Sequence, residues 1–429
     1  MLLRMSVENH CSIHRTQELS LIAAPLKGSK SGLISTAGLP NEQILPAAVI
    51  YGPNASGKSN FISALAFMIE AVRFSQNRWG VDEGIPNNPF LLDGDDAELA
   101  SRYEIDFVSD GVRYTYGFKS DALEFTDEWL FSFPEGRQRL LFERKKGNFF
   151  KFGAALTGKK SAIKDLVRSN SLFLSAAIQN NLQSLMPVFK FFKDIMLRNS
   201  VSSPPQAIYS EFKDSEFDER VMKFLSSIGT GIDGYQQLEN DRPEETLDQL
   251  SRMFEVLIGK RKNKEKMMKE FLEDNAKEHK VEFSHLSLSG KSVFFDVSKE
   301  STGTRRLIPL LVSAFKAIDN GLVLVVDEFD ASLHTQICDL ILALFNNADI
   351  NKSGAQLIAT THDTNLLCSQ HLRRDQIWLV EKDKFGASEL YSLAEVKIRD
   401  TDNFEKGYLQ GRYGALPFSG STEQVLRKL

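Results

Sequence analysis

The first third of the chain alternates between hydrophobic and polar positions, as half-buried β-strands do. Two alternating segments flank Asp110-Gly111, and this arrangement predicts a β-hairpin. Further alternating segments follow, separated by the Pro134-Glu135-Gly136 turn. The predicted strands are 1–8 with a partner at 19–23, then 103–108, 112–118, 123–133, 137–144 and 149–152. Together the later segments predict an antiparallel sheet inserted after a first strand and helix.

The middle of the chain has a helical period instead. Residues 161–197 and 216–279 are predicted to be mainly helical, with a break at 201–205. A second hairpin is predicted at 280–297, around Ser289-Gly290. The chain contains no internal repeat and no sustained heptad pattern, so a long coiled coil is not expected.

The last third alternates helices with apolar strands, which is typical of an α/β fold. Helices are predicted at 304–318 and 333–345. Strands are predicted at 322–327, 356–361 and 376–380, and a polar tail begins at about residue 397. The chain therefore combines an antiparallel β region, a helical region and an α/β region.

Composition narrows the class of protein. The 429 residues are 42% hydrophobic and 25% charged, as in a soluble globular chain with more than one lobe. The net charge of −5 excludes binding of nucleic acid by bulk charge, so a local basic patch would be needed. The three cysteines form no C-x-x-C pair, which fits a reducing compartment. No signal peptide or apolar run of about 18 residues is present, so we expect a cytoplasmic protein with no membrane partner.

A glycine-containing loop follows the apolar segment 47–51 and fits the spacing G-x-x-x-x-G-K-[ST] in full. The glycines let backbone N–H groups point inward around an anion, and the next helix adds the positive end of its dipole. Lys58 would then reach the β- and γ-phosphates, and the Ser59 hydroxyl would bind Mg²⁺. The alternative is an ordinary strand–turn–helix corner, which the apolar strand and the unbroken helix argue against. The predicted nucleotide-binding residues are Gly52, Pro53, Asn54, Ala55, Ser56, Gly57, Lys58, Ser59 and Asn60.

A continuous apolar run ends in Asp327 and Glu328. Such runs are typical of strands in a parallel sheet, whose carboxyl ends lie where ligands bind. Asp327 would hold Mg²⁺ through water or Ser59, and Glu328 would polarise a water for attack on the γ-phosphate. A buried strand followed by a surface acid pair is the alternative, which the complete phosphate loop disfavours. Residues 351–354 lack the aspartate of the guanine-reading N-K-x-D, and this favours ATP over GTP.

The order of the motifs resembles that of the ABC/SMC-like ATPases. The phosphate loop is followed by Ser301-Thr302-Gly303-Thr304-Arg305-Arg306, the acidic strand, Ala331-Ser332-Leu333-His334 and Ala359-Thr360-Thr361-His362-Asp363. The segments SVENHCSI and NFEKGYLQGRYGALPF are similar to the RloA-like group of AAA-type proteins from prokaryotic phage-defence operons. The resemblance implies an α/β fold of the ABC/SMC-like ATPase head type: a mixed sheet with a P-loop core, an antiparallel β subdomain and a helical insertion. The head would comprise 1–160 and 281–429, with the insertion at 161–280.

The same resemblance implies roles for further residues. Ser301, Thr302, Gly303 and Thr304 match the signature motif, which caps the γ-phosphate of a second subunit, although they depart from L-S-G-G-Q. Ala331 and Ser332 match the D-loop, which touches the partner's site. His362 matches the switch histidine that senses the γ-phosphate. Gln179 would be the Q-loop glutamine. The implied catalytic residues are therefore Glu328 and His362, and the implied metal ligands are Ser59, Asp327 and Gln179.

Each of these features also has an ordinary structural interpretation. The segment 301–304 by itself is a helix N-cap, and a lone histidine after a strand is usually structural. The basic cluster 260–269 is more often a solvated helix face than a patch that binds nucleic acid or a partner. Phe404, Tyr408 and Tyr413 in the tail are more often packing residues than recognition residues.

Three functions are consistent with the sequence. The first is an ATPase that forms head-to-head dimers or multiples of them and regulates a separate, nuclease-like effector in antiphage defence, with ATP and Mg²⁺ as ligands. The second is a DNA-repair or DNA-binding ATPase of the RecF or SMC type, for which nucleic acid would be a partner. The third is a scaffold that binds ATP and hydrolyses almost none of it.

Overall fold

The computed structural model describes residues 1–26, 32–92, 94, 100–198, 218–258, 264–397 and 403–415. The chain divides into two compact units, of which one comprises Met1–Ser200 with Ser313–Leu429 and the other Val201–Val312. This division differs from the predicted insertion at 161–280 at both ends. Apolar side chains between residues 163 and 195 belong to the core of the first unit, because they pack in one cluster with helix α1 (Lys58–Phe74).

One sheet in the described part of the first unit is antiparallel throughout, with the order β2-β1-β4-β5-β6-β7-β8. Its pairing confirms the predicted hairpin at Asp110-Gly111 and the meander that follows. Strand β1 extends this sheet by pairing with β4, which the sequence did not indicate. The strands are β1 (Leu2–Glu8), β2 (Gln17–Ser20), β4 (Ser101–Ser109), β5 (Val112–Ser120), β6 (Phe125–Phe133), β7 (Arg139–Lys145) and β8 (Phe149–Phe152).

The second sheet of this unit has the order β16-β15-β3-β14-β13-β9 within the described residues. All of its neighbouring strands are parallel except β15 and β16. The predicted strands at 322–327, 356–361 and 376–380 are confirmed, whereas β9 and β16 were not predicted. The strands are β3 (Ala47–Tyr51), β9 (Met196–Arg198), β13 (Val323–Val326), β14 (Gln356–Thr361), β15 (Ile377–Lys382) and β16 (Ser388–Ser392).

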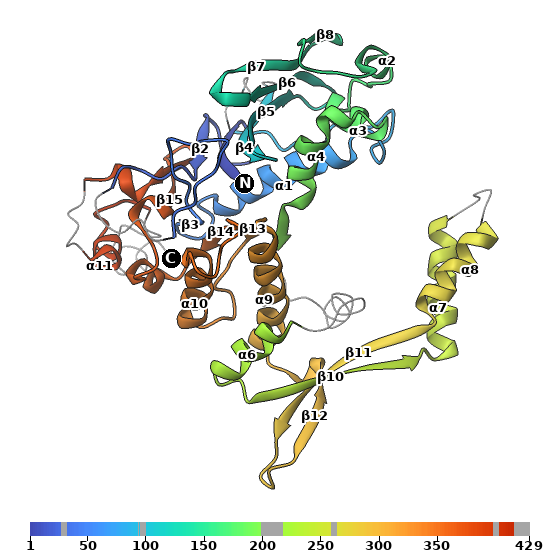
Figure 1. Cartoon of the computed structure of the whole chain (residues 1–429), viewed down its shortest axis with the longest axis vertical. Helices are drawn as coiled ribbons and strands as arrows, with labels where there is room; N and C mark the ends of the chain where they lie inside the picture. The colour runs from blue at the N-terminus through green and yellow to red at the C-terminus, as the bar shows by residue number, and fades with distance from the viewer. Residues whose placement is uncertain are drawn as a thin grey trace. The chain divides into compact units, whose positions relative to one another are not determined.

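Successive side chains along each strand of this sheet point to opposite faces. Ala48 and Ile50 of β3, with Val323 and Val325 of β13, belong to the core cluster that contains the apolar face of α1. Helix α1 lies between the two sheets of the unit, and α10 (Thr335–Asn346) lies on the other side of the parallel sheet (Figure 1). Burial on both faces explains why these strands read as continuous apolar runs.

The remaining helices of the first unit are short. They are α2 (Lys160–Lys164), α3 (Phe173–Gln179), α4 (Met186–Asp194) and α11 (Phe404–Leu409), with 3-10 turns η2 (Pro134–Gly136), η3 (Gln183–Leu185), η5 (Thr364–Cys368), η6 (Arg374–Gln376) and η7 (Leu393–Glu395). Helix α9 (Thr302–Asn320) begins in the second unit and ends in the first. No helix in the described segments has the length and apolar character that crossing a bilayer requires.

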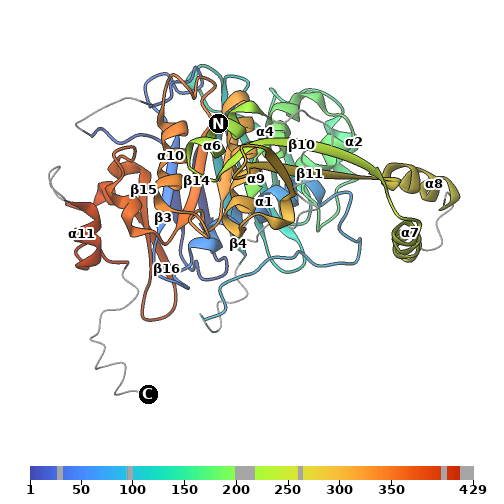
Figure 2. The same ribbon diagram turned by 90° about the horizontal axis from the view of Figure 1, so that it is seen from below.

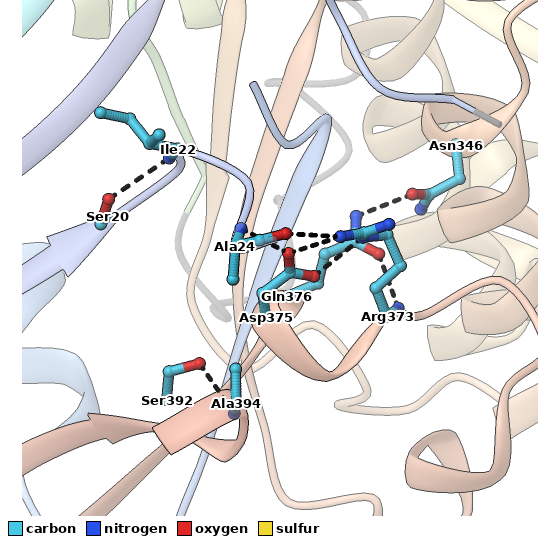
Figure 3. A network of polar contacts seen from close by, with 9 residues as sticks. All are labelled: Ser20, Ile22, Ala24, Asn346, Arg373, Asp375, Gln376, Ser392 and Ala394. Carbon is cyan, nitrogen blue, oxygen red and sulfur yellow. Dashed lines mark hydrogen bonds and ion pairs between the residues drawn. The ribbon is translucent and has the colours of Figure 1, made fainter. Parts of the chain in front are cut away.

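Buried polar side chains fix the start of β15. The Arg373 guanidinium donates to Asp375 at 2.8 and 2.9 Å, and the Asp375 carboxylate accepts from the backbone N–H of Ala24 at 2.9 Å. Gln376 donates from Nε2 to Asn346 at the end of α10, at 2.7 Å (Figure 3). Because Asp375 and Gln376 are buried, this network ties β15 both to α10 and to the segment after β2.

The second unit contains a three-stranded antiparallel sheet in its described residues, with the order β10-β11-β12. The predicted hairpin around Ser289-Gly290 is confirmed, but β10 lies in a region that was predicted to be helical. Strands β10 and β11 run side by side as a ribbon to α7 and α8 (Figure 2), which pack through Phe254 and Phe271, stacked 3.8 Å apart. The predicted break at 201–205 lies outside the described residues. The elements are α6 (Glu219–Ser227), β10 (Ile232–Asp241), α7 (Glu244–Ile258), α8 (Lys264–Asn275), β11 (Lys277–Leu286), β12 (Ser292–Asp296) and η4 (Val297–Lys299).

Candidate active site

The topology of the parallel sheet brings three predicted motifs to one edge. Strand β14 lies between β3 and β13, and all three run in the same direction. The carboxyl ends of parallel strands meet at one edge of a sheet, where ligands bind in open α/β folds. The phosphate loop follows β3, Asp327 and Glu328 follow β13, and His362 follows β14. Residues 300 positions apart in the sequence therefore become neighbours.

The backbone of the phosphate loop requires glycine at two positions. Gly57 has φ 109°, and a Cβ atom there would lie 2.1 Å from Ser388 Oγ and 2.6 Å from Ser12 Oγ. Gly52 is equally restricted, because a Cβ atom would lie 2.4 Å from the carbonyl oxygen of Val380. Helix α1 begins at Lys58, so its first N–H groups and its positive dipole end face the loop. A larger residue at either glycine would therefore disrupt the cradle.

Lys58 is folded back onto the loop. Lys58 is only 5% exposed, and its Nζ donates to the carbonyl oxygens of Gly52 at 2.8 Å and Pro53 at 3.0 Å. His362 Nδ1 lies 3.3 Å from the same ammonium. Burial lowers the pKa of Lys58 to about 8, against the opposing effect of nearby carboxylates, of which Asp327 is the largest. Because this pKa lies above 7, Lys58 is mainly a cation at neutral pH and can bind an anion that enters the loop.

The hydroxyl and carboxylate of the predicted metal site lie in contact. Ser59 Oγ donates to Asp327 Oδ1 at 3.1 Å. The same oxygen of Asp327 accepts from Thr360 Oγ1 of β14 at 2.6 Å. The backbone N–H of Asp327 donates to the carbonyl of Arg198 in β9 at 2.9 Å. Asp327 is therefore oriented from both neighbouring strands, with its carboxylate beside the Ser59 hydroxyl.

Glu328 occupies a turn with left-handed backbone, φ 50°, directly after Asp327. Its N–H donates to Thr360 Oγ1 at 2.7 Å, so one threonine hydroxyl fixes both acidic residues. The next residues form a tight turn, in which Ala331 N–H donates to the Glu328 carbonyl at 3.0 Å. Ser332 is exposed and also has left-handed backbone, with φ 61°. Positive φ at non-glycine residues is strained, and such residues are concentrated at functional sites.

His362 is fixed through its main chain. Its N–H donates to both carboxylate oxygens of Asp330, at 3.2 and 3.3 Å. Burial and the Lys58 ammonium lower the pKa of His362, while Asp330, Glu328 and Asp327 oppose that effect. The imidazole is therefore neutral at physiological pH and faces the cation of the phosphate loop.

These residues fit a magnesium-bound triphosphate. The loop offers a cradle that only glycine backbone allows, with one buried ammonium. The Ser59 hydroxyl and the Asp327 carboxylate are oxygen donors of the type that Mg²⁺ prefers. Ser56 Oγ is buried at the loop and has no hydrogen-bond partner among the described residues, as expected of a group that awaits a ligand.

Comparison with known proteins identifies the family. Residues 47–369 match the family model described as "AAA domain, putative AbiEii toxin, Type IV TA system". The match spans most of the chain, from strand β3 to the segment just after His362. The chain belongs to this AAA-domain family. No curated protein matches the chain significantly. The fold is accordingly that of a P-loop ATPase domain of the AAA type, in which a nucleotide-binding ATPase site is expected at the phosphate loop.

In this AAA-domain protein, Gln179 does not lie at the phosphate loop. It is an exposed residue at the end of α3. The start of α3 is anchored just past the far end of α1, where the backbone N–H of Gln76 donates to Ser175 Oγ at 3.3 Å. Helix α1 rises by roughly 24 Å from Lys58 to Phe74 at 1.5 Å per residue. The length of α1 therefore separates Gln179 from Ser59, and a glutamine side chain cannot cover that distance.

The predicted signature segment lies in the second unit. Ser301 Oγ accepts from Thr304 N–H at 3.1 Å and contacts Thr304 Oγ1 at 2.9 Å. Ser301 thus caps α9, and Ser301 and Thr302 are exposed. The N-cap interpretation of this segment is confirmed. The role of Ser301–Thr304 as a signature motif stays a prediction.

Four residues of the site were missed at the sequence level. Thr360 was quoted only as part of a motif, and Asp330 was not singled out. Ser12 and Ser388 support the loop from behind: Ser388 Oγ donates to the Ser56 carbonyl at 2.6 Å and contacts Ser12 Oγ at 2.6 Å. Asn60 donates from Nδ2 to Ser12 Oγ at 2.6 Å. Isolated serines give no pattern, so only the fold could reveal this support.

Proposed function

We propose that this AAA-domain protein binds and hydrolyses ATP with Mg²⁺ and acts as a nucleotide-driven sensor or regulator of a separate effector. The observation that carries the proposal is the convergence of Lys58, the Ser59–Asp327 pair, Glu328 and His362 at one sheet edge. These groups supply the cation, the metal ligands, the base and the γ-phosphate sensor that phosphoryl transfer to water needs.

Each residue has a defined task in this proposal. Lys58 would exchange the carbonyls of Gly52 and Pro53 for phosphate oxygens. Ser59 and Asp327 would hold Mg²⁺, which neutralises charge on the phosphate oxygens when it is bound. Glu328 would take a proton from the attacking water, and His362 would stabilise charge that develops on the γ-phosphate.

A second copy of the chain would complete the site. The Ser301–Thr304 segment at the start of α9, of which Ser301 and Thr302 are exposed, would cap the partner's γ-phosphate, aided by the positive end of the helix. The turn at Ala331 and the exposed Ser332 would meet the partner as a D-loop. We therefore propose a head-to-head dimer, or multiples of one, with two nucleotides at its interface.

The effector would be a separate chain, nuclease-like and encoded nearby, in a prokaryotic antiphage or abortive-infection system. Support comes from the resemblance to the RloA-like group and from the family description, which refers to a toxin of a type IV toxin–antitoxin system. In this proposal, ATP binding and hydrolysis move the second unit between two positions and so change the effector's activity.

The decisive experiment measures phosphate release by purified protein with Mg²⁺ and ATP, together with its mass by light scattering. We expect turnover that requires Mg²⁺ and a dimer that ATP favours. Co-purification with the untagged product of a neighbouring gene would support the effector proposal. Protein that neither binds labelled ATP nor changes mass with it would overturn the proposal as a whole.

The alternative is a RecF- or SMC-like ATPase that binds DNA. The basic cluster 260–269 was its main support, and residues 260–263 lie outside the described part of the chain. The described lysines of the cluster face glutamates: Lys264 lies 2.6 Å from Glu255, Lys266 3.7 Å from Glu270 and Lys269 3.8 Å from Glu273. This pairing favours a solvated helix face. A gel shift with and without ATP distinguishes this alternative from the proposed regulator, since a DNA-binding ATPase would show ATP-dependent, salt-sensitive binding.

A further inference from the structure

Asp330 joins the turn after Glu328 to the loop that carries His362. Its carboxylate accepts the N–H of His362 with both oxygens, at 3.2 and 3.3 Å. Its own carbonyl accepts from Leu333 N–H at 3.0 Å, which closes the turn that contains Ala331 and Ser332. Asp330 therefore belongs to the exposed turn through its main chain and to the His362 loop through its side chain.

The hydrogen bonds to Asp330 hold the main chain of His362 in place. The imidazole Nδ1 lies 3.3 Å from Lys58 Nζ, and that distance depends on where the main chain of His362 lies. A displacement of about 1 Å at a reacting group can cost roughly 100-fold in rate. The Asp330 carboxylate accepts the backbone N–H of His362 with both oxygens and so restricts such a displacement.

We propose that Asp330 is a positioning residue, which couples the Ala331–Ser332 turn to His362. A second copy of the chain that docks on this turn would move Asp330, and Asp330 would carry the movement to the main chain of His362. Hydrolysis would then depend on docking of the partner even though Asp330 itself does not touch the nucleotide. This inference rests on the proposed ATPase function and adds its regulation.

Two substitutions separate the hydrogen bond from the charge. Asp330→Asn keeps a carbonyl oxygen where it can accept the His362 N–H, but it removes the negative charge. Asp330→Ala removes both. If Asp330 acts by position, kcat falls less than about threefold in Asp330→Asn and at least about tenfold in Asp330→Ala, whereas the Kd for a fluorescent ATP analogue stays within about twofold in both.

The matched control is Asp349→Ala, in an exposed loop between α10 and β14, which should behave as wild type in kcat and Kd. Exchange of the His362 backbone amide supplies an independent readout: we expect slow exchange in the wild type and in Asp330→Asn, and fast exchange in Asp330→Ala. Should Asp330→Ala fail to fold, Asp330→Ser replaces it, because its shorter side chain keeps a polar group in the turn but does not reach the His362 N–H.

The outcomes distinguish the two proposals. Wild-type protein without ATP turnover would overturn the proposed function. Wild-type turnover combined with full activity of the Asp330→Ala or Asp330→Ser variant would overturn the positioning role alone. Equal losses in Asp330→Asn and Asp330→Ala would also overturn it, because charge and not position would then explain the effect.

Discussion

The ammonium of Lys58 and the Nδ1 atom of His362 lie 3.3 Å apart, although 304 positions separate these residues in the sequence. Burial lowers the pKa of both groups, and the Lys58 ammonium lowers the pKa of His362 further. An anion between them would raise the pKa of Lys58 again, because a negative charge favours the protonated form of the lysine. The pair is therefore poised to respond to a phosphate.

This relationship predicts that ATP binding takes up protons at mildly alkaline pH. The pKa of Lys58 is about 8 before ATP binds, so at pH 8.5 the lysine is mainly neutral. Phosphate oxygens favour the ammonium and raise this pKa, so binding takes up a fraction of a proton and affinity falls as pH rises through 8. Calorimetry in two buffers of different ionisation enthalpy measures the uptake. At pH 7 Lys58 is already mainly protonated, so its contribution should be much smaller there. Equal heats in both buffers at pH 8.5 would contradict the assignment.

Glu328→Gln should separate binding from hydrolysis. The amide preserves the shape of the side chain but cannot accept a proton from water, and loss of a general base costs about 100-fold or more in kcat. We expect ATP binding to persist and the dimer to accumulate, as phosphate-release and light-scattering measurements would show. Glu70→Gln is the matched control, because Glu70 is exposed on α1. Turnover by Glu328→Gln at the wild-type rate would remove Glu328 from the mechanism.

Thr360 should matter for metal affinity more than for folding. Its hydroxyl donates to Asp327 Oδ1 and accepts from Glu328 N–H, so Thr360→Val leaves both acidic residues without that partner. We expect about 1–3 kcal/mol of destabilisation, because the Glu328 N–H and Asp327 Oδ1 each lose one hydrogen bond. The Mg²⁺ concentration for half-maximal turnover should rise several-fold, because the Asp327 carboxylate loses its orientation. Thr360→Ser keeps the hydroxyl and should restore both quantities. A magnesium dependence that is the same in Thr360→Val and the wild type would refute this role.

The sequence predicted the parts of the site that are encoded locally. The phosphate loop has its glycines, lysine and serine within eight positions, and Asp327 and Glu328 end an apolar run, so each pattern carries its own chemistry. Thr360, Asp330, Ser12 and Ser388 act through contacts across strands or loops. The Ser12–Ser388 contact spans 376 positions, and no local pattern marks either serine.

The wrong predictions also have physical causes. Strand β10 was predicted to be helical because its sequence, IDGYQQLEND, does not alternate regularly between apolar and polar residues; the structure accordingly leaves most of these residues half-buried or exposed. Its pairing with β11, some 45 positions later in the chain, forms the strand. Gln179 was assigned from a single residue type, and a lone glutamine carries no spacing that could test the assignment.

His10 should make the protein sensitive to acid. It is buried between Tyr103, whose hydroxyl lies 2.9 Å from Nδ1, and Ser63, whose hydroxyl lies 2.8 Å from Nε2. Burial lowers its pKa from 6.5 to about 4, so the folded protein binds fewer protons than the unfolded chain between these values. Stability from this group is therefore complete above pH 6.5 and is lost as pH falls toward 4. The loss amounts to about 2 kcal/mol by pH 5.

Urea unfolding at pH 7 and pH 5 tests this linkage. His10→Gln keeps groups that can hydrogen-bond to Tyr103 and Ser63 but does not titrate in this range, so its stability should fall about 2 kcal/mol less than that of the wild type between the two pH values. His371→Gln, at an exposed position, should follow the wild type. If His10→Gln and the wild type lose the same free energy of unfolding, His10 is not the group that titrates, and acid sensitivity must arise from other residues.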